Sequence, residues 1–100
     1  MNRARCEAAG VSNVDFRVGD AAQFVWPEPG TVHLVFINWL LMCLTDAEAR
    51  GVLKQAIASL APGGAVFLHE SGDLDIAPET AHYEPYSAEY PAQYRHPAWY

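Results

Sequence analysis

A predicted strand–helix–strand unit between residues 32 and 68 constrains the fold of this chain more than any other feature. Residues 32–37 (VHLVFI) are rich in β-branched and aromatic types, which is typical of a strand buried on both faces. Thr45 and Glu48 have the spacing of a capping box and predict a helix start. The helix then carries apolar residues at i, i+3 and i+4 spacing: Ala49, Val52, Leu53, Ala56, Ile57 and Leu60.

Pro62-Gly63-Gly64 ends this predicted helix and turns the chain into a second buried strand at residues 65–68. A strand, helix and strand joined by short turns form a right-handed crossover, so the two strands should be parallel neighbours. The chain is therefore expected to be an α/β protein. Ligands of open parallel sheets collect outside the carboxyl ends of the strands. Asn38 and Trp39 follow the first strand and His69 follows the second, so these side chains are candidates for a site.

The N-terminal part predicts one more helix and one more strand. Residues 2–9 contain good helix formers, and Gly10 suits a C-terminal cap. Residues 14–18 (VDFRV) alternate between apolar and charged types, which indicates a strand near a sheet edge. Asp20 follows this strand. It could accept a hydrogen bond from a ligand, or it could cap the short turn at residues 21–24.

From Gly72 onward the composition changes, and all five tyrosines of the chain lie in this part. Four prolines (Pro78, Pro85, Pro91 and Pro97) break any helix there. We therefore divide the chain into a core at residues 1–71 and a Tyr/Pro-rich segment at residues 72–100. The segment is either a loosely ordered tail or a lid over the strand ends, and as a lid it would offer phenolic hydroxyls and the Arg95 guanidinium to an anionic group.

Composition excludes some functions. A net charge of −6 disfavours nucleic acid, and no apolar run reaches the length of a membrane span. Cys6 and Cys43 are isolated, which favours buried free thiols in a reducing, cytoplasmic environment. The four histidines have no ligand-like spacing, so no metal site is expected.

Several motifs together resemble class I S-adenosylmethionine-dependent methyltransferases. They are residues 13–16 (NVDF), 19–21 (GDA), the strand at 32–37 and residues 60–64 (LAPGG). Residues 38–42 (NWLLM), 70–73 (ESGD) and 94–97 (YRHP), with Tyr100 behind them, are similar more narrowly to phosphoethanolamine N-methyltransferases of plants and nematodes. The resemblance implies a partial Rossmann-like fold. Its parallel strands would lie near 14–18, 32–37 and 65–70, with helices near 2–9 and 46–60.

The resemblance also implies the ligands. The cofactor would be S-adenosylmethionine, with Asp20 accepting a hydrogen bond from the adenine amino group and the Ala21 backbone beside it. Asn38 and Trp39 would lie where the methyl donor meets the substrate. The substrate would be a small amine, phosphoethanolamine or its methylated forms. Its phosphate would be held by three residues of the tail: Tyr94, Arg95 and Tyr100.

The chain departs from the family at several positions. Cys43 stands where relatives carry Tyr or His, and either it or His69 could act as the base that takes the amine proton. His33 stands where the family has Asp and is expected to be a core residue. No G-x-G turn occurs in the sequence. We therefore expect these residues to be a fragment that binds the cofactor weakly or not at all by itself.

Three alternatives remain open from the sequence. The same fold could methylate another small molecule, the chain could be a non-catalytic α/β interaction module, or it could be a nucleotide-binding α/β domain of another kind. The missing glycine-rich turn counts against the last of these as much as against a methyltransferase.

Overall fold

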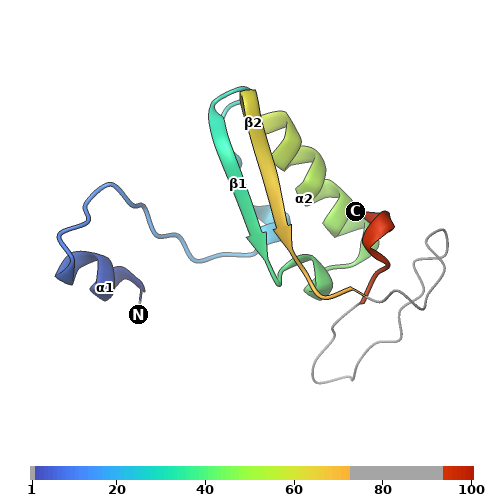
Figure 1. Cartoon of the computed structure of the whole chain (residues 1–100), viewed down its shortest axis with the longest axis horizontal. Coiled ribbons are helices and arrows are strands. Elements are labelled where there is room, and N and C mark those ends of the chain that lie inside the picture. Colours follow the sequence, from blue (N-terminus) through green and yellow to red (C-terminus); the bar gives the residue numbers. More distant parts are fainter. Residues whose placement is uncertain (1, 73–93) are drawn as a thin grey trace.

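The computed structural model describes residues 2–72 and 94–100, and its centre is a two-stranded parallel sheet with one helix against it (Figure 1). Strand β1 (Val32–Asn38) pairs with strand β2 (Leu60–His69), and helix α2 (Asp46–Ser59) connects them. The register runs from Leu34 opposite Ala65 to Asn38 opposite His69. The predicted strand–helix–strand unit and its parallel pairing are confirmed.

Helix α2 begins at the predicted capping box. The Thr45 hydroxyl accepts the Glu48 amide at 3.3 Å, and the Glu48 carboxylate accepts the Thr45 amide at 2.9 Å. The buried face of the helix consists of four residues: Ala49, Val52, Ala56 and Ser59. Ala49 and Val52 of this face form the core cluster with Ile37, Leu41 and Leu44, of which Ile37 and Leu41 are 5% and 0% exposed.

The chain passes from α2 into β2 through an irregular stretch of strand. We expected a turn at residues 62–64 before the strand, but β2 already begins at Leu60, and its pairing with β1 shifts between Val32 and Leu34. Gly63 has φ +80°, which favours glycine. A Cβ on Gly64 would lie 2.9 Å from the Val32 carbonyl oxygen. The two glycines thus let β2 approach β1 closely while it absorbs the extra residues.

The N-terminal part agrees with the prediction only in its helix. Helix α1 (Asn2–Ala8) lies at residues 2–9 as expected, but residues 14–18 form no strand. The alternating pattern indicated an extended chain, and a strand also needs a partner for its backbone groups. Within the part of the chain that the structure describes, β1 and β2 pair only with each other, and Val18 is fully exposed. The prediction of a third parallel strand is wrong for this structure.

The two faces of the sheet differ. Side chains of Val35 and Ile37 point toward α2 and the core, whereas Leu34, Phe36 and Phe67 lie on the open face and are 57–62% exposed. The Phe36 and Phe67 rings stack at 5.4 Å. The expectation of strands buried on both faces therefore holds for one face only.

Three short 3₁₀ helices complete the described structure: η1 (Ala21–Gln23), η2 (Leu41–Cys43) and η3 (Pro97–Trp99). Segment 94–100, red in Figure 1, lies beside the first turn of α2, near the carboxyl ends of the strands. The remainder of the predicted Tyr/Pro-rich segment, residues 73–93, lies outside the described residues. No helix among the described residues is long and apolar enough to cross a membrane.

Candidate functional site

The carboxyl ends of β1 and β2 bring three of the predicted site residues together. Asn38 and His69 are direct neighbours in the register, and the Asn38 Oδ1 lies 2.6 Å from the His69 Nδ1. The Trp39 indole stacks on the His69 imidazole, with ring centroids 5.8 Å apart. Trp39 also donates its backbone amide to the His69 carbonyl at 2.9 Å. Since these side chains follow neighbouring parallel strands, their meeting is a consequence of the confirmed topology.

Trp39 adopts an unusual backbone conformation. Its φ is +48°, in the left-handed region that non-glycine residues rarely enter. Such a conformation costs free energy and persists only where the surroundings hold it. In this chain the strained residue is Trp39 itself, whose indole ring stacks on the His69 imidazole.

Glu70 is a site residue whose role the sequence did not reveal. Its Oε1 accepts the amides of Leu40 and Leu41 at 2.9 and 3.0 Å, and its Oε2 accepts the Met42 amide at 3.3 Å. These amides begin η2, where the helix itself supplies no acceptor. The sequence shows an acidic residue shortly after a predicted strand, but it does not show what this residue binds, because its partners are 28 to 30 residues away in sequence.

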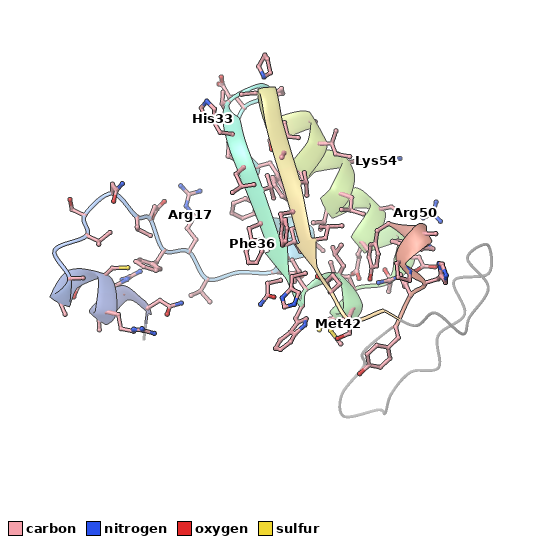
Figure 2. The ribbon with its side chains drawn as sticks, viewed as in Figure 1. Arg17, His33, Phe36, Met42, Arg50 and Lys54 are labelled. Atoms are coloured by element: carbon pink, nitrogen blue, oxygen red, sulfur yellow. The ribbon has the colours of Figure 1, made fainter. Side chains whose placement is uncertain are left out.

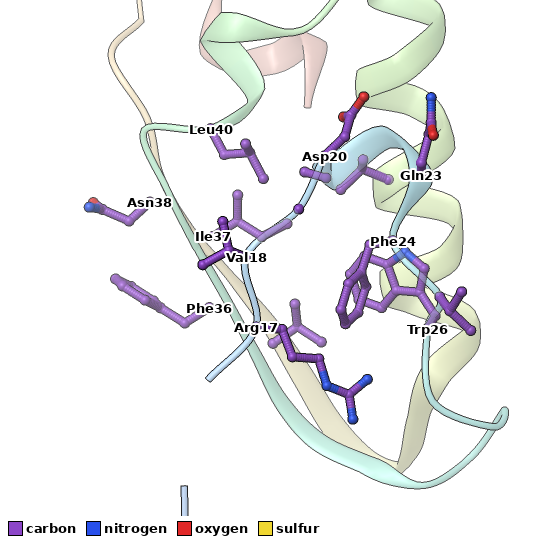
Figure 3. A pocket seen from close by; sticks show the side chains of 15 residues that line it. Arg17, Val18, Asp20, Gln23, Phe24, Trp26, Phe36, Ile37, Asn38 and Leu40 are labelled. Atoms are coloured by element: carbon purple, nitrogen blue, oxygen red, sulfur yellow. The ribbon is translucent and has the colours of Figure 1, made fainter. Parts of the chain in front are cut away.

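A cavity of about 880 Å³ runs along β1 toward the strand end (Figure 3). Asp20, Ala21 and Asn38 line it, as do the rings of Phe24 and Trp26, which meet edge-to-face at 5.4 Å. The remaining lining residues are Arg17, Val18, Gly19, Gln23, Val25, Val35, Phe36, Ile37, Leu40 and Val52. Three of the four predicted cofactor contacts therefore share one cavity, whereas Trp39 lies outside its lining.

Asp20 caps the 3₁₀ helix η1. Its Oδ1 accepts the Ala22 amide at 2.9 Å, so the capping interpretation from the sequence is confirmed. A carboxylate has acceptor capacity beyond one such bond, and Asp20 is exposed at the cavity. Capping therefore leaves the proposed ligand contact chemically available.

The predicted phosphate-binding residues of segment 94–100 lie in a different setting. Arg95 is 0% exposed, and its Nη1 and Nη2 donate to the carbonyl oxygens of Leu41 and Leu44 at 2.6 and 2.7 Å. Its Nε donates to Asp46 Oδ1 at 2.9 Å. The guanidinium also lies 4.6 Å from the centroid of the Trp99 ring. In this arrangement the Arg95 guanidinium binds groups of its own chain. Contact with a phosphate would require the bonds to Leu41, Leu44 and Asp46 to open.

Tyr100 packs against the core beside Arg95, and its hydroxyl is buried without a hydrogen bond of good geometry. Burial raises the pKa of Tyr100, and the neighbouring Arg95 guanidinium offsets this only in part. Tyr94 is half-buried next to Arg95 in the chain. The substrate role of these residues remains a prediction.

The other residues considered from the sequence are exposed or partly buried. Cys43 is exposed, with its Sγ 3.9 Å from the Trp39 carbonyl oxygen. Cys6 is partly buried, so both cysteines are free thiols but neither is the buried residue that we expected. His33 is exposed as well, which corrects its assignment to the core. Among residues 2–72 and 94–100, no cluster of His, Cys, Asp or Glu could hold a metal ion.

Comparison with known proteins gives both a family and a set of distant relatives. Phosphoethanolamine N-methyltransferase 1 of Triticum aestivum is 38% identical over 61 residues, which is 56% of this chain and 12% of the relative. The protein of the same name from Caenorhabditis elegans is 38% identical over 63 residues (63% and 13%). That from Arabidopsis thaliana is 30% identical over 80 residues (75% and 14%).

The matched part thus spans only 12–14% of the length of these relatives. No solved structure matches the chain significantly. A family model described as a methyltransferase domain matches residues 1–64. Because this match covers more than half of the 100 residues, the chain belongs to the methyltransferase domain family.

Proposed function

We propose that this chain contributes to an S-adenosylmethionine-dependent N-methyltransferase whose acceptor is phosphoethanolamine or one of its methylated forms. Methyltransferase domains of this family are typically dependent on that cofactor. Relatives from wheat, a nematode and Arabidopsis carry the name phosphoethanolamine N-methyltransferase. The observation that carries the proposal is the cavity, which ends at Asn38 beside the His69–Trp39 pair.

The residues around this cavity fit a nucleoside cofactor. Phe24 and Trp26 offer apolar surface to a purine, and Asp20 offers a carboxylate oxygen to its amino group. When bound, the cofactor would supply a methyl group on a sulfonium. The role of the chain would be to hold this group against the acceptor nitrogen in a near-attack geometry.

His69 is the stronger of the two candidate bases. In the orientation that the structure gives Asn38, its amide oxygen faces the His69 Nδ1, and this contact fits the tautomer with the hydrogen on Nδ1. In a neutral imidazole this leaves Nε2 with a lone pair that can take the proton from the substrate ammonium. Cys43 remains the second candidate, although its thiol is directed to the Trp39 carbonyl at 3.9 Å. Tyr94 and Tyr100 are kept as proposed phosphate contacts, and Arg95 would join them only if its bonds to Leu41, Leu44 and Asp46 opened.

Methyl transfer can be tested in a chimera, in which residues 1–72 of this chain replace the corresponding part of the wheat relative, to which the chain is 38% identical over 61 residues. We expect transfer of a labelled methyl group to phosphoethanolamine, and a loss of kcat in His69→Gln that exceeds the loss in Cys43→Ser. His33→Gln is the matched control, because His33 is exposed on the same sheet away from the strand end. A chimera that folds but methylates other small amines equally well would refute the assigned substrate. A folded chimera without any transfer would favour a non-catalytic module.

Cofactor binding by the chain itself is tested separately by calorimetry with S-adenosylhomocysteine. We expect weak or no binding, because the sequence holds no glycine-rich G-x-G turn to receive the methionine part. A dissociation constant in the micromolar range would contradict this expectation. Asp20→Asn should then weaken the binding if the cavity is the site.

A further inference from the structure

The loop that joins β1 to α2, residues 39–44, is held from both ends by charged side chains that come from distant parts of the chain. We call it the strand-end loop. It contains Trp39, whose φ of +48° needs external support, and Cys43. Figure 1 shows the loop below the two strand ends, between β2 and segment 94–100.

Glu70 holds the first half of the strand-end loop. Its carboxylate accepts the consecutive amides of Leu40, Leu41 and Met42 at 2.9 to 3.3 Å. Hydrogen bonds to an ionised carboxylate are roughly twice as strong as neutral ones. Since the amides directly follow Trp39, fixing them also fixes the strained residue.

Arg95 holds the second half of the strand-end loop. It donates to the carbonyl oxygens of Leu41 and Leu44, and its third donor reaches the Asp46 carboxylate in the first turn of α2. The side chain is 0% exposed, and the planar guanidinium serves acceptors in three directions at once. Segment 94–100 is tied to the strand end by a bridge between Gly72 and Arg95. The position of the loop therefore depends on this segment.

We infer that Glu70 and Arg95 are positioning residues for the strand-end loop. They keep Trp39 on the His69 ring, so the docking of segment 94–100 orders the proposed site. The consequence for methyl transfer rests on the proposed function, but the ordering of the loop does not. Arg95 is thereby assigned a role different from phosphate binding.

The inference is tested on the full chain by amide hydrogen exchange and NMR without any ligand. In the wild type, the amides of Leu40 and Leu41 should exchange slowly although η2 gives them no acceptor, and fast exchange would overturn the inference without any variant. Glu70→Gln should raise the exchange rates of the three capped amides about tenfold or more, because one charge-assisted acceptor is lost. Arg95→Lys should raise the rates in the same loop, because an ammonium on a flexible stem cannot serve three fixed acceptors.

The same spectra report positioning as distinct from stability. The His69 ring protons lie against the Trp39 indole and should be displaced upfield; in both variants this displacement should shrink. Glu7→Gln and Arg5→Lys are the matched controls, since Glu7 and Arg5 are exposed on α1, and neither should change the loop. Loss of protection along the whole β1–β2 ladder in both variants would instead assign these residues to general stability and overturn the inference.

A final measurement distinguishes the two roles considered for Arg95, namely phosphate binding and positioning of the strand-end loop. If phosphoethanolamine added to the wild type moves the Arg95 Nε–H resonance and exposes the amides of the strand-end loop, Arg95 is a substrate ligand and the positioning role is wrong. If the resonance and the loop stay unchanged, the positioning role stands whether or not the protein transfers methyl groups.

Discussion

The same substitution, glycine to alanine, should have opposite effects at Gly64 and Gly51. Gly64 lies where β2 passes closest to β1, and an added Cβ would lie 2.9 Å from the carbonyl oxygens of both Ala61 and Val32. A third carbonyl oxygen, that of His33, would be 3.2 Å away. All three atoms belong to the backbone, so none can move aside without disturbing the strand pairing. Gly51 lies within α2, and its Cβ would meet nothing within 4 Å.

The magnitudes follow from these surroundings. Overpacking a close contact costs about 1–3 kcal/mol, so Gly64→Ala should lower the free energy of unfolding by that amount. An alanine in a helix interior is about 1 kcal/mol more favourable than a glycine, so Gly51→Ala should raise it. For a domain of this size, 1 kcal/mol corresponds to roughly 4–8 °C in Tm.

The assay is thermal and urea unfolding followed by circular dichroism, with both variants and the wild type measured side by side. Gly51→Ala serves as the control for the method, because it changes the same number of atoms. A Gly64→Ala variant that unfolds within about 2 °C of the wild type, while Gly51→Ala shows its expected gain, would refute the close approach of β2 to β1 at this point. It would also remove the explanation given for the register shift between Val32 and Leu34.

Three further outcomes are expected. Thr45→Ala should cost about 1 kcal/mol in urea unfolding because it removes one half of the capping box, whereas Thr45→Ser should keep most of the stability. Tyr100→Phe should be neutral or slightly stabilising near pH 7, since it removes a buried hydroxyl that makes no hydrogen bond of good geometry. Because the pKa of Tyr100 is raised above 10.0 in the folded chain, the wild type should lose stability as the pH rises beyond about 10, and the part of this loss that is due to Tyr100 should be absent in Tyr100→Phe. Leu41→Ala should cost about 2–5 kcal/mol, because Leu41 is fully buried in the core; a cost below 1 kcal/mol would contradict this assignment.

The sequence allowed the strand–helix–strand unit to be predicted because its signals are local. The capping box needs residues three apart, and the apolar face of α2 repeats within two turns. The strand expected at residues 14–18 failed for the opposite reason. Alternation describes a chain that can pair, but pairing depends on a neighbour elsewhere in the sequence, and β1 and β2 pair only with each other among the described residues.

The contacts of the candidate site were likewise predictable only in part. The meeting of Asn38 and His69 follows from the register of two parallel strands, so it could be predicted from the topology. The contacts of Glu70 and Arg95 join residues 28 to 54 positions apart, and no spacing rule indicates them. Arg95 was expected to face a ligand because an arginine among tyrosines suits a phosphate. A buried guanidinium also suits two carbonyl oxygens and a carboxylate, and composition does not distinguish these partners.

The end of β1 is where the cofactor and the amine of the proposed reaction would meet. Figure 3 shows the Asn38 side chain directed away from Asp20, on the other side of the strand from Phe24 and Trp26. His69 lies with Asn38 on the open face, where the two are hydrogen-bonded. An in-line methyl transfer requires donor and acceptor on opposite sides of the transferred group. A cofactor in the cavity and an amine at His69 would meet at the end of β1, where the Asn38 side chain lines the cavity and contacts His69, and the strand-end loop would hold Trp39 beside them. This arrangement depends on the φ of Trp39, which is why the bonds that Glu70 makes to the next three amides matter to the site as well as to the fold.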